Sequence, residues 1–265
     1  LVLADLERRP ELLEVPAVRV YASCYRAVVA GRSEEDFRTL RRVIAAQRDH
    51  FPKHEMRDIY LLAINYCIRA LNAGRRELLS DIQQLYRESL EQGYLLEDGH
   101  LPESTFTNMI ALHLKLGHFD EGAHIMETYA QDLPAATRES ILHFNRARWY
   151  HAQGQADTAL PLLARVDTNA PYLYLGAKSL QLRIFYEQGS YAASESILQQ
   201  LRQYLHRRKD LGYRQENYRL LVQFFRQLLS VSAKDKKAVD LLIEKVQAAP
   251  TFAEKVWLLA QLERL

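Results

Sequence analysis

Cysteine, proline and glycine are scarce in this chain of 265 residues, which contains 2 cysteines, 8 prolines and 10 glycines. Two cysteines, Cys24 and Cys67, are too few for a disulfide framework, and we expect both thiols to pack as small apolar side chains. No segment alternates Val, Ile or Thr with polar residues over the length of a strand. Leu, Ala, Gln, Arg and Glu, which favour helices, are abundant instead. The composition therefore predicts an all-α protein.

A large excess of charge of one sign is also missing. Lys and Arg number 35 and Asp and Glu number 33, which gives a net charge of +2. This balance disfavours a protein that binds nucleic acid mainly by neutralising phosphates. No apolar run approaches the roughly 18 residues of a membrane span, so we expect none. The first residues, LVLADLERRP, contain neither an initiator Met nor a signal peptide, and we expect a fragment of a longer, cytoplasmic protein.

The sequence motifs of common enzyme classes are absent. There is no HExxH, GxSxG, GxxxxGK, GxGxxG or CxxC pattern in the chain. We therefore expect no catalytic residues and no cofactor. The pair His50 and His54 is interrupted by Pro52, which disfavours a continuous helix that presents both imidazoles on one face.

Residues 113–124 gather three histidines and two carboxylates in a short stretch. His113, His118, Asp120, Glu121 and His124 have side chains that metal ions bind. The alternative is a helix, a turn and a second helix that carry them as surface and packing residues. In that interpretation His113 lies on the first helix, His118 in the turn and His124 on the second helix. The clustering in sequence therefore does not imply that the side chains converge in space, and we expect no metal to bind.

Turns of similar form recur along the chain. Apolar residues repeat at the spacing of amphipathic helices, and breakers divide the chain into about thirteen helices. Five of the turns follow a helix at a glycine, spaced 43, 43, 37 and 35 residues apart, namely Gly31, Gly74, Gly117, Gly154 and Gly189. Glycine suits these positions because the backbone becomes left-handed where such a helix ends. Four prolines stand at or just before expected helix starts, namely Pro102, Pro134, Pro171 and Pro250.

The repeated turns resemble those of tetratricopeptide (TPR) repeats. In that family an aromatic residue follows the turn glycine after two positions, a small residue after five, a large apolar residue after nine and a proline after seventeen. In this chain the aromatic residues are Phe119 and Tyr191, and the small residues are Gly122, Ala159 and Ser194. The large apolar residues are Met126, Leu163 and Leu198, and the prolines are Pro134 and Pro171. The match is best over residues 102–205, and a sixth unit aligns through Ala238, Leu242 and Pro250.

The resemblance implies a right-handed superhelical solenoid of about six antiparallel helix pairs with a C-terminal capping helix. We expect a single repeat domain over residues 1–265, with units at 16–50, 55–92, 102–133, 135–170, 171–208 and 214–249 and a cap at 250–265. Leu79 departs from the pattern because it takes the small-residue position of its unit. Four aromatic residues are expected in the core, namely Tyr172, Tyr174, Phe224 and Phe225.

Seven candidate binding residues recur at fixed distances before the turn glycines, namely Asn65, Asn108, Asn145, Arg148, His151, Arg183 and Tyr186. The asparagines lie nine residues before a glycine, the arginines six, and His151 and Tyr186 three. The resemblance implies that this phase faces a concave groove, where an asparagine hydrogen-bonds the backbone or the terminal carboxylate of an extended peptide. The alternative for the three asparagines is that they join adjacent helices inside the stack.

The leading functional interpretation is a non-enzymatic scaffold whose groove binds a peptide or protein segment. A second interpretation is a helical repeat that binds single-stranded RNA, because residues 105–129 also resemble a pentatricopeptide unit in which one polar residue per repeat reads a base. A third is a structural or oligomerisation domain of a larger protein. The sequence distinguishes an interaction protein from an enzyme better than it distinguishes these three.

Overall fold

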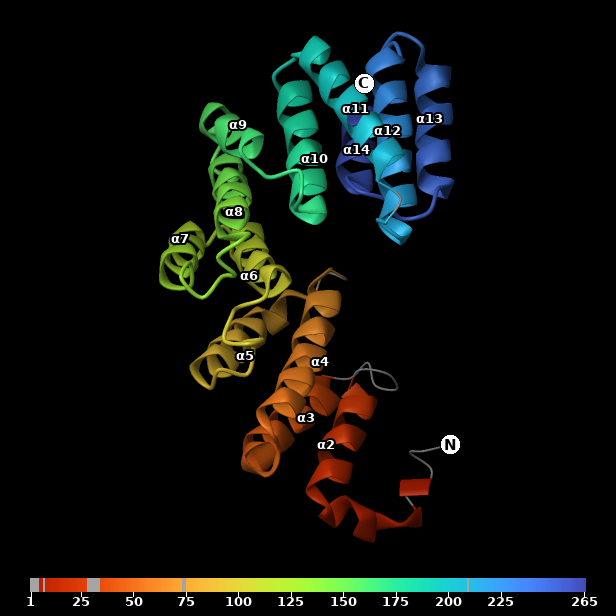
Figure 1. The fold of residues 1–265 in the computed structure, drawn as a ribbon. Helices are drawn as coiled ribbons and strands as arrows, with labels where there is room; N and C mark the ends of the chain where they lie inside the picture. The colour runs from red at the N-terminus through yellow and green to blue at the C-terminus, as the bar shows by residue number, and fades with distance from the viewer. Residues whose placement is uncertain (1–4, 7, 28–33, 73–74, 209) are drawn as a thin grey trace. The chain divides into compact units, whose positions relative to one another are not determined.

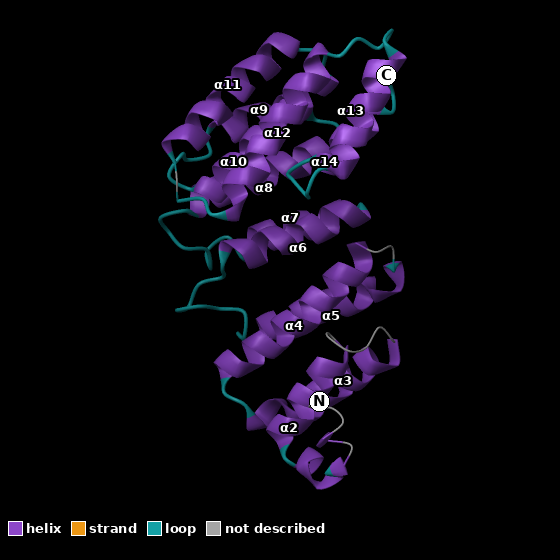
Figure 2. Ribbon diagram, turned by 90° about the vertical axis from the view of Figure 1, so that its right-hand side faces the viewer, coloured by secondary structure: helices purple, strands orange, loops and turns teal. Residues whose placement is uncertain are grey.

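The protein is all-α. The computed structural model describes residues 5–6, 8–27, 34–72, 75–208 and 210–265. These residues form thirteen α-helices and no sheet (Figures 1 and 2). A single isolated bridge pairs Glu97 with His100 in the loop after α5. The prediction of an all-α fold with about thirteen helices is confirmed for the described residues.

The α-helices of the described residues are 8 to 20 residues long. The α-helices are α2 (Pro16–Tyr25), α3 (Glu34–Gln47), α4 (Lys53–Asn72), α5 (Leu79–Glu91), α6 (Glu103–Leu116), α7 (Phe119–Thr128), α8 (Arg138–Ala152), α9 (Ala156–Ala164), α10 (Pro171–Glu187), α11 (Tyr191–Arg207), α12 (Tyr213–Ser230), α13 (Lys236–Ala248) and α14 (Lys255–Leu262). Three short 3₁₀ helices complete the described secondary structure: η1 (Pro10–Glu14), η3 (Arg48–His50) and η4 (Arg76–Leu78).

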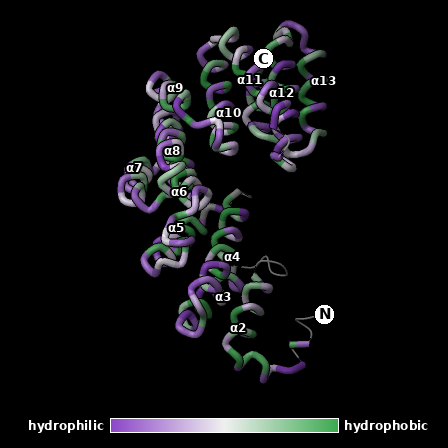
Figure 3. The backbone as a smooth tube through the Cα atoms, viewed as in Figure 1, coloured by the Kyte–Doolittle hydropathy of each residue, from purple (hydrophilic) through white to green (hydrophobic). Residues whose placement is uncertain are grey.

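Consecutive helices pack as antiparallel pairs. α2 packs on α3, α4 on α5, α8 on α9 and α10 on α11, and α10 also packs on α8 and α9 of the preceding pair. α14 contacts both α12 and α13, as expected of a helix that covers the end of the last pair. Along the tube of Figure 3, hydrophobic and hydrophilic stretches alternate within the helices, as expected of amphipathic helices.

The helix contacts divide the chain into two compact units, Leu1–Thr105 and Phe106–Leu265. The boundary lies in the first turn of α6, shortly after the loop 93–102. The two cysteines belong to the first unit, where Cys24 is 4% and Cys67 0% exposed. Burial raises the pKa of the Cys24 thiol to about 11 and that of the Cys67 thiol to about 12. Both therefore pack as predicted, as protonated apolar side chains.

Three of the predicted turn glycines adopt the left-handed conformation. The φ angles are 73° at Gly117, 76° at Gly154 and 68° at Gly189. After each glycine the next backbone N–H donates to the carbonyl five residues earlier, at 2.8–2.9 Å, in the pairs His118–His113, Gln155–Tyr150 and Ser190–Phe185. This is the Schellman arrangement, which satisfies the last carbonyls of a helix while the chain reverses. Gly31 and Gly74 lie outside the described residues.

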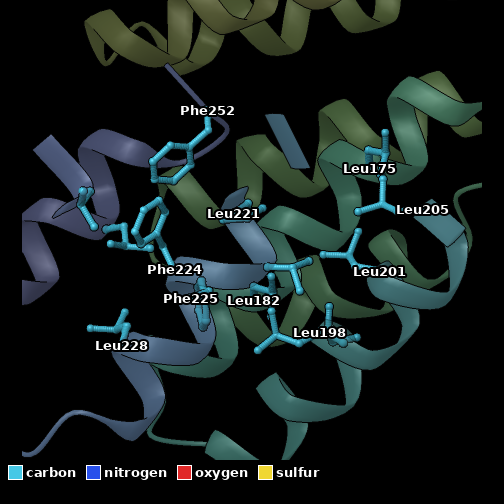
Figure 4. Packing of buried hydrophobic residues seen from close by; sticks show 14 of the residues in the cluster. Leu175, Leu182, Leu198, Leu201, Leu205, Leu221, Phe224, Phe225, Leu228 and Phe252 are labelled. Carbon is cyan, nitrogen blue, oxygen red and sulfur yellow. The ribbon is translucent and has the colours of Figure 1, made fainter. Parts of the chain in front are cut away.

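Leucine and phenylalanine side chains form the core of the second unit between α10 and α14 (Figure 4). The Phe225 ring stacks on Trp257 with centroids 5.5 Å apart, and the Phe224 ring stacks on Phe252 at 5.3 Å. Phe224 and Phe225 are 5% and 0% exposed, so their predicted place in the core is confirmed. Helix α14 joins the core through Leu258 and Leu262, and Trp257 packs against it. None of the described helices combines the length and hydropathy that a bilayer span requires.

Replacing a left-handed glycine tests the turn. A Cβ at Gly154 would meet no heavy atom within 4 Å, so Gly154→Ala changes only the backbone energy. We expect it to lower the free energy of unfolding by about 1–2 kcal/mol, measured by urea denaturation. The control is Gly122→Ala in α7, where the nearest atom is 3.7 Å from the added Cβ and the helical backbone favours alanine. Equal effects of the two substitutions would contradict the left-handed turn.

Candidate functional site

A cavity of about 440 Å³ opens on the first helices of four successive pairs in the second unit. Its lining comes from α6, α8, α10 and α12 and from the residue that precedes α14. The lining residues are Thr107, Asn108, Ala111, Phe144, Arg148, Tyr172, Leu175, Gly176, Ser179, Leu180, Arg183, Arg214, Tyr218 and Glu254. We call this cavity the first-helix groove. It contains Asn108, Arg148 and Arg183, three of the seven residues that the sequence singled out.

The charge of the first-helix groove is positive. Three arginines and one glutamate line it, which leaves two positive charges uncompensated. Glu254 is held by Arg183, whose Nη1 lies 3.2 Å from Glu254 Oε2. No carboxylate forms a salt bridge with Arg148 in the part of the chain that the structure describes. Burial lowers the pKa of the Arg148 guanidinium, but an arginine stays protonated at any physiological pH.

The Arg148 guanidinium is oriented by neighbouring polar groups. Its Nη1 donates to Asn145 Oδ1 at 3.4 Å and to the Thr107 carbonyl at 3.5 Å. These neutral acceptors fix its position without neutralising its charge. The guanidinium carbon also lies 5.5 Å from the centre of the Phe144 ring. Arg148 is therefore a positioned cation with capacity left for an anionic ligand.

Arg214 and Tyr172 form a stacked pair at the groove. The Arg214 guanidinium carbon lies 3.6 Å from the centre of the Tyr172 ring, a close cation–π contact. The Nη1 atom of Arg214 is buried and has no hydrogen-bond partner among the described residues. Tyr172 is 55% exposed, so the prediction that it lies in the core is wrong. It stands at the second position of α10, where its side chain extends over the α12 arginine, and Tyr174 is half-buried against Tyr204.

One wall of the groove depends on a glycine inside a helix. A Cβ on Gly176 in α10 would come within 2.8 Å of the Phe144 ring from α8. The missing side chain lets the two helices approach, so that Arg148 and Arg183 line one cavity. On the α12 side, Tyr218 completes the lining. Burial raises its pKa to about 12, so the phenol keeps its proton and can donate a hydrogen bond.

The three phased asparagines lie in different surroundings. Asn108 is exposed and lines the groove. Asn145 is fully buried, and its Nδ2 donates to Thr107 Oγ1 at 3.2 Å and to the Ile141 carbonyl at 2.9 Å. It joins α8 to α6, which is the packing role that the sequence left open, and we do not include it among the binding residues. Asn65 is exposed on α4, in the first unit.

His151 and Tyr186 contribute to a network beside the groove and do not line it. His151 Nε2 lies 3.1 Å from Glu187 Oε2, and Trp257 Nε1 donates to Glu187 Oε1 at 2.9 Å. The hydrogen bond from His151, followed by that from Trp257, holds the pKa of the Glu187 carboxyl below its usual value despite its partial burial. Tyr186 packs edge-on against Trp257, with centroids 5.5 Å apart. The network ties α8, α10 and α14 together.

A larger cavity of about 850 Å³ lies on α11 and α12. Arg202, Arg219, Arg226 and His206 line it together with glutamines and the apolar side chains of Leu205 and Val222. Its arginines are exposed to solvent, which screens their charge. The first-helix groove holds half-buried arginines with unused donors, and we therefore favour it as the binding site.

The structure brings together three metal-binding side chains that the sequence did not place together. Ligand atoms of His113, His118 and Glu121 all lie within 4.8 Å of one another. The sequence did not imply this convergence, which the structure shows for these three. The Schellman turn at Gly117 brings the end of α6 against the start of α7, so residues on different helices meet. His124, one turn further along α7, is not part of the group.

Several groove residues could not be assigned from the sequence. Arg214, Tyr218 and Glu254 carry no repeated spacing relative to a turn glycine. Gly176 had a detectable signal, because a glycine within a helical pattern often marks a close helix contact. Comparisons of the chain with protein-family models, curated proteins and solved structures gave no match. The function is therefore argued from the groove itself.

Two asparagines at the same repeat position provide a matched test of the site. We expect Asn145→Ala to lower the free energy of unfolding by about 1–3 kcal/mol, because it removes three hydrogen bonds from a buried position, namely those to Thr107 and Ile141 and that from Arg148. Asn108→Ala, at an exposed position, should change it by less than about 0.5 kcal/mol. Urea denaturation measures both. A loss at Asn108 as large as at Asn145 would contradict this division of roles.

Proposed function

We propose that this chain is a non-enzymatic interaction protein whose first-helix groove binds an extended peptide or protein segment through a carboxylate. The observation that carries the proposal is Arg148, a half-buried cation that neutral groups hold in place and that has no carboxylate partner among the described residues. A buried charge is stable only when it is compensated. A ligand carboxylate that pairs with Arg148 and with the free donors of Arg183 would supply that compensation.

The other groove residues support a ligand that is a chain. Asn108, Arg148, Arg183 and Arg214 come from α6, α8, α10 and α12, so a ligand that meets all four contacts four successive helices. Asn108 can pair with a peptide group, because its amide donates and accepts. Tyr172 and Phe144 add aromatic surface beside the cations. These features favour an extended peptide over a small compact ion.

The titratable groups of the groove support binding more than catalysis. They are three arginines, two tyrosines and one glutamate paired with Arg183. The arginines do not release a proton, and Tyr218, with a pKa of about 12, does not act as a base at neutral pH. A recognition site needs fixed donors and charges of this kind, and an acid–base catalyst needs a group that titrates near the working pH.

The repeat architecture is part of the proposal. We infer that the helix pairs form a right-handed superhelical solenoid of the tetratricopeptide type. The left-handed turns at Gly117, Gly154 and Gly189 support this, as do the buried small residues Ala159 and Ser194 five positions after their glycines. In such a stack the first helices of successive pairs lie beside one another, which is where the groove residues occur.

Single-stranded RNA is the alternative ligand, because arginines also bind phosphates. The phased asparagines argue against base reading, because Asn145 is buried and bonded to α6. A purely structural role as an assembly domain would leave the groove without a ligand. Both alternatives are separable by experiment.

The test uses a library of short peptides with free C-terminal carboxylates, each paired with the same peptide as a C-terminal amide. We expect the chain to select peptides with the free carboxylate. Fluorescence anisotropy should show that Arg148→Ala combined with Arg183→Ala weakens the affinity for these peptides by at least about tenfold, since charge-assisted hydrogen bonds contribute about 1.5–3 kcal/mol each.

The matched control removes two arginines from the other cavity. Arg202→Ala with Arg226→Ala changes the net charge equally but should leave peptide affinity unchanged. Equal losses in the two double variants would indicate nonspecific attraction. Binding of single-stranded RNA at low salt that depends on Arg148, without any selected peptide, would replace the proposal by the RNA alternative. Failure to select any peptide would contradict it.

A further inference from the structure

A second site lies at the turn between α6 and α7. We propose that His113, His118 and Glu121 form a binding site for a divalent transition metal, and that the ion it takes is Zn²⁺. The three side chains come from the last turn of α6, the residue before α7 and the first turn of α7. The proposal is independent of peptide binding, because none of these residues lines the first-helix groove.

The distances suit coordination after a small side-chain movement. The ligand atoms lie within 4.8 Å of one another. Zinc binds imidazole nitrogen and carboxylate oxygen at about 2.0–2.2 Å, which places tetrahedral ligand atoms roughly 3.4 Å apart. We expect rotations of the exposed His118 and Glu121 side chains to close that difference.

The backbone at the site is fixed by hydrogen bonds. The His118 N–H donates to the His113 carbonyl at 2.9 Å, and the Gly122 N–H donates to the His118 carbonyl at 3.2 Å. Gly117 supplies the left-handed residue between the two histidines, at a φ of 73°. A site whose ligands are attached to a formed turn loses little conformational entropy when the metal binds.

The surroundings of His113 point to a missing partner. His113 is only 9% exposed, and its Nδ1 atom is buried with no hydrogen-bond partner among the described residues. Buried polar atoms without a partner are rare in folded proteins and call for an explanation. A Cβ on Gly122 would stand 3.8 Å from the His113 Cβ and 3.7 Å from Trp149, so α7 approaches His113 closely at this glycine. A metal ion at His113 would provide the missing partner.

The donor set decides the kind of metal. Two imidazoles and one carboxylate suit Zn²⁺ and its transition-metal neighbours, whereas Mg²⁺ and Ca²⁺ prefer six or more oxygen ligands. Three protein ligands leave a fourth position for water. Bound in this way, the ion would link the end of α6 to the start of α7. It would therefore stabilise this helix pair against unfolding.

The experiment is a calorimetric titration of the EDTA-treated, dialysed chain with ZnCl₂, accompanied by thermal unfolding. We expect one ion per chain and, at a free Zn²⁺ concentration about a hundredfold above Kd, a rise in Tm of about 5–10 °C. Loss of an outer-shell partner alone typically weakens metal affinity about 10- to 100-fold. His113→Ala and Glu121→Gln, which remove ligands directly, should each weaken binding by at least about tenfold. MgCl₂ should bind far more weakly.

Two matched variants separate a defined site from general attraction of zinc to surface histidines. His124→Ala and Asp120→Asn remove potential ligands from the same segment that lie outside the group, and both should bind Zn²⁺ as the unmodified chain does. Glu121 is exposed, so Glu121→Gln keeps the fold even if His113→Ala does not, and circular dichroism checks this. The proposal is overturned if the chain binds no Zn²⁺, or if Glu121→Gln binds it as tightly as the unmodified chain.

Discussion

Left-handed turns at the ends of α6, α8 and α10 are the constraint on which both proposed sites depend. Gly117, Gly154 and Gly189 reverse the chain within a few residues, and α9 and α11 pack back on α8 and α10. The first helix of the next pair then packs on the pair before it, as α10 does on α8 and α9. Residues more than thirty positions apart consequently line one groove. The same turn brings His113 to His118 and Glu121.

The groove is built around charge that its own residues do not neutralise. Glu254 compensates Arg183, and Tyr172 covers the guanidinium of Arg214. Arg148 receives only neutral acceptors, from Asn145 and from the Thr107 carbonyl. Holding a partly desolvated cation in this way destabilises the fold unless an anion joins it. An arrangement that is unfavourable for stability is typical of a binding site, because the ligand supplies what the fold lacks.

The sequence predicted the architecture well because its signals are local. A glycine that ends a helix, an apolar repeat and a proline before a helix start each depend on a few neighbouring residues. The helix bounds confirm the turn or helix start at Gly117, Gly154, Gly189, Pro102 and Pro171. Phase along a helix also singled out Asn108, Arg148 and Arg183, which line the first-helix groove. Phase alone could not tell that Asn108 is exposed and Asn145 buried, because the exposure of a side chain depends on the helix that packs against it. Asn145 is covered by α6, where Thr107 accepts its hydrogen bond.

The remaining features of the two sites depend on contacts between distant segments. Arg214 and Glu254 enter the groove from α12 and from the residue before α14, and no spacing in the sequence relates them to Arg148. Tyr172 was expected in the core because it is aromatic. At the start of α10 it is exposed instead, and its ring stacks on the Arg214 guanidinium. His113, His118 and Glu121 meet only because the turn between their helices is tight. Such pairings arise from packing, and a single sequence does not contain them.

The central claim is that Arg148 pairs with a carboxylate of the ligand, and a double-mutant cycle tests it most directly. The affinities of the unmodified chain and of Arg148→Ala are measured for one selected peptide with a free C-terminal carboxylate and for its C-terminal amide. The account predicts a coupling energy of about 1.5–3 kcal/mol between the guanidinium and the carboxylate, so that amidation matters little once Arg148 is gone. A coupling energy near zero, with both changes weakening binding independently, would contradict it.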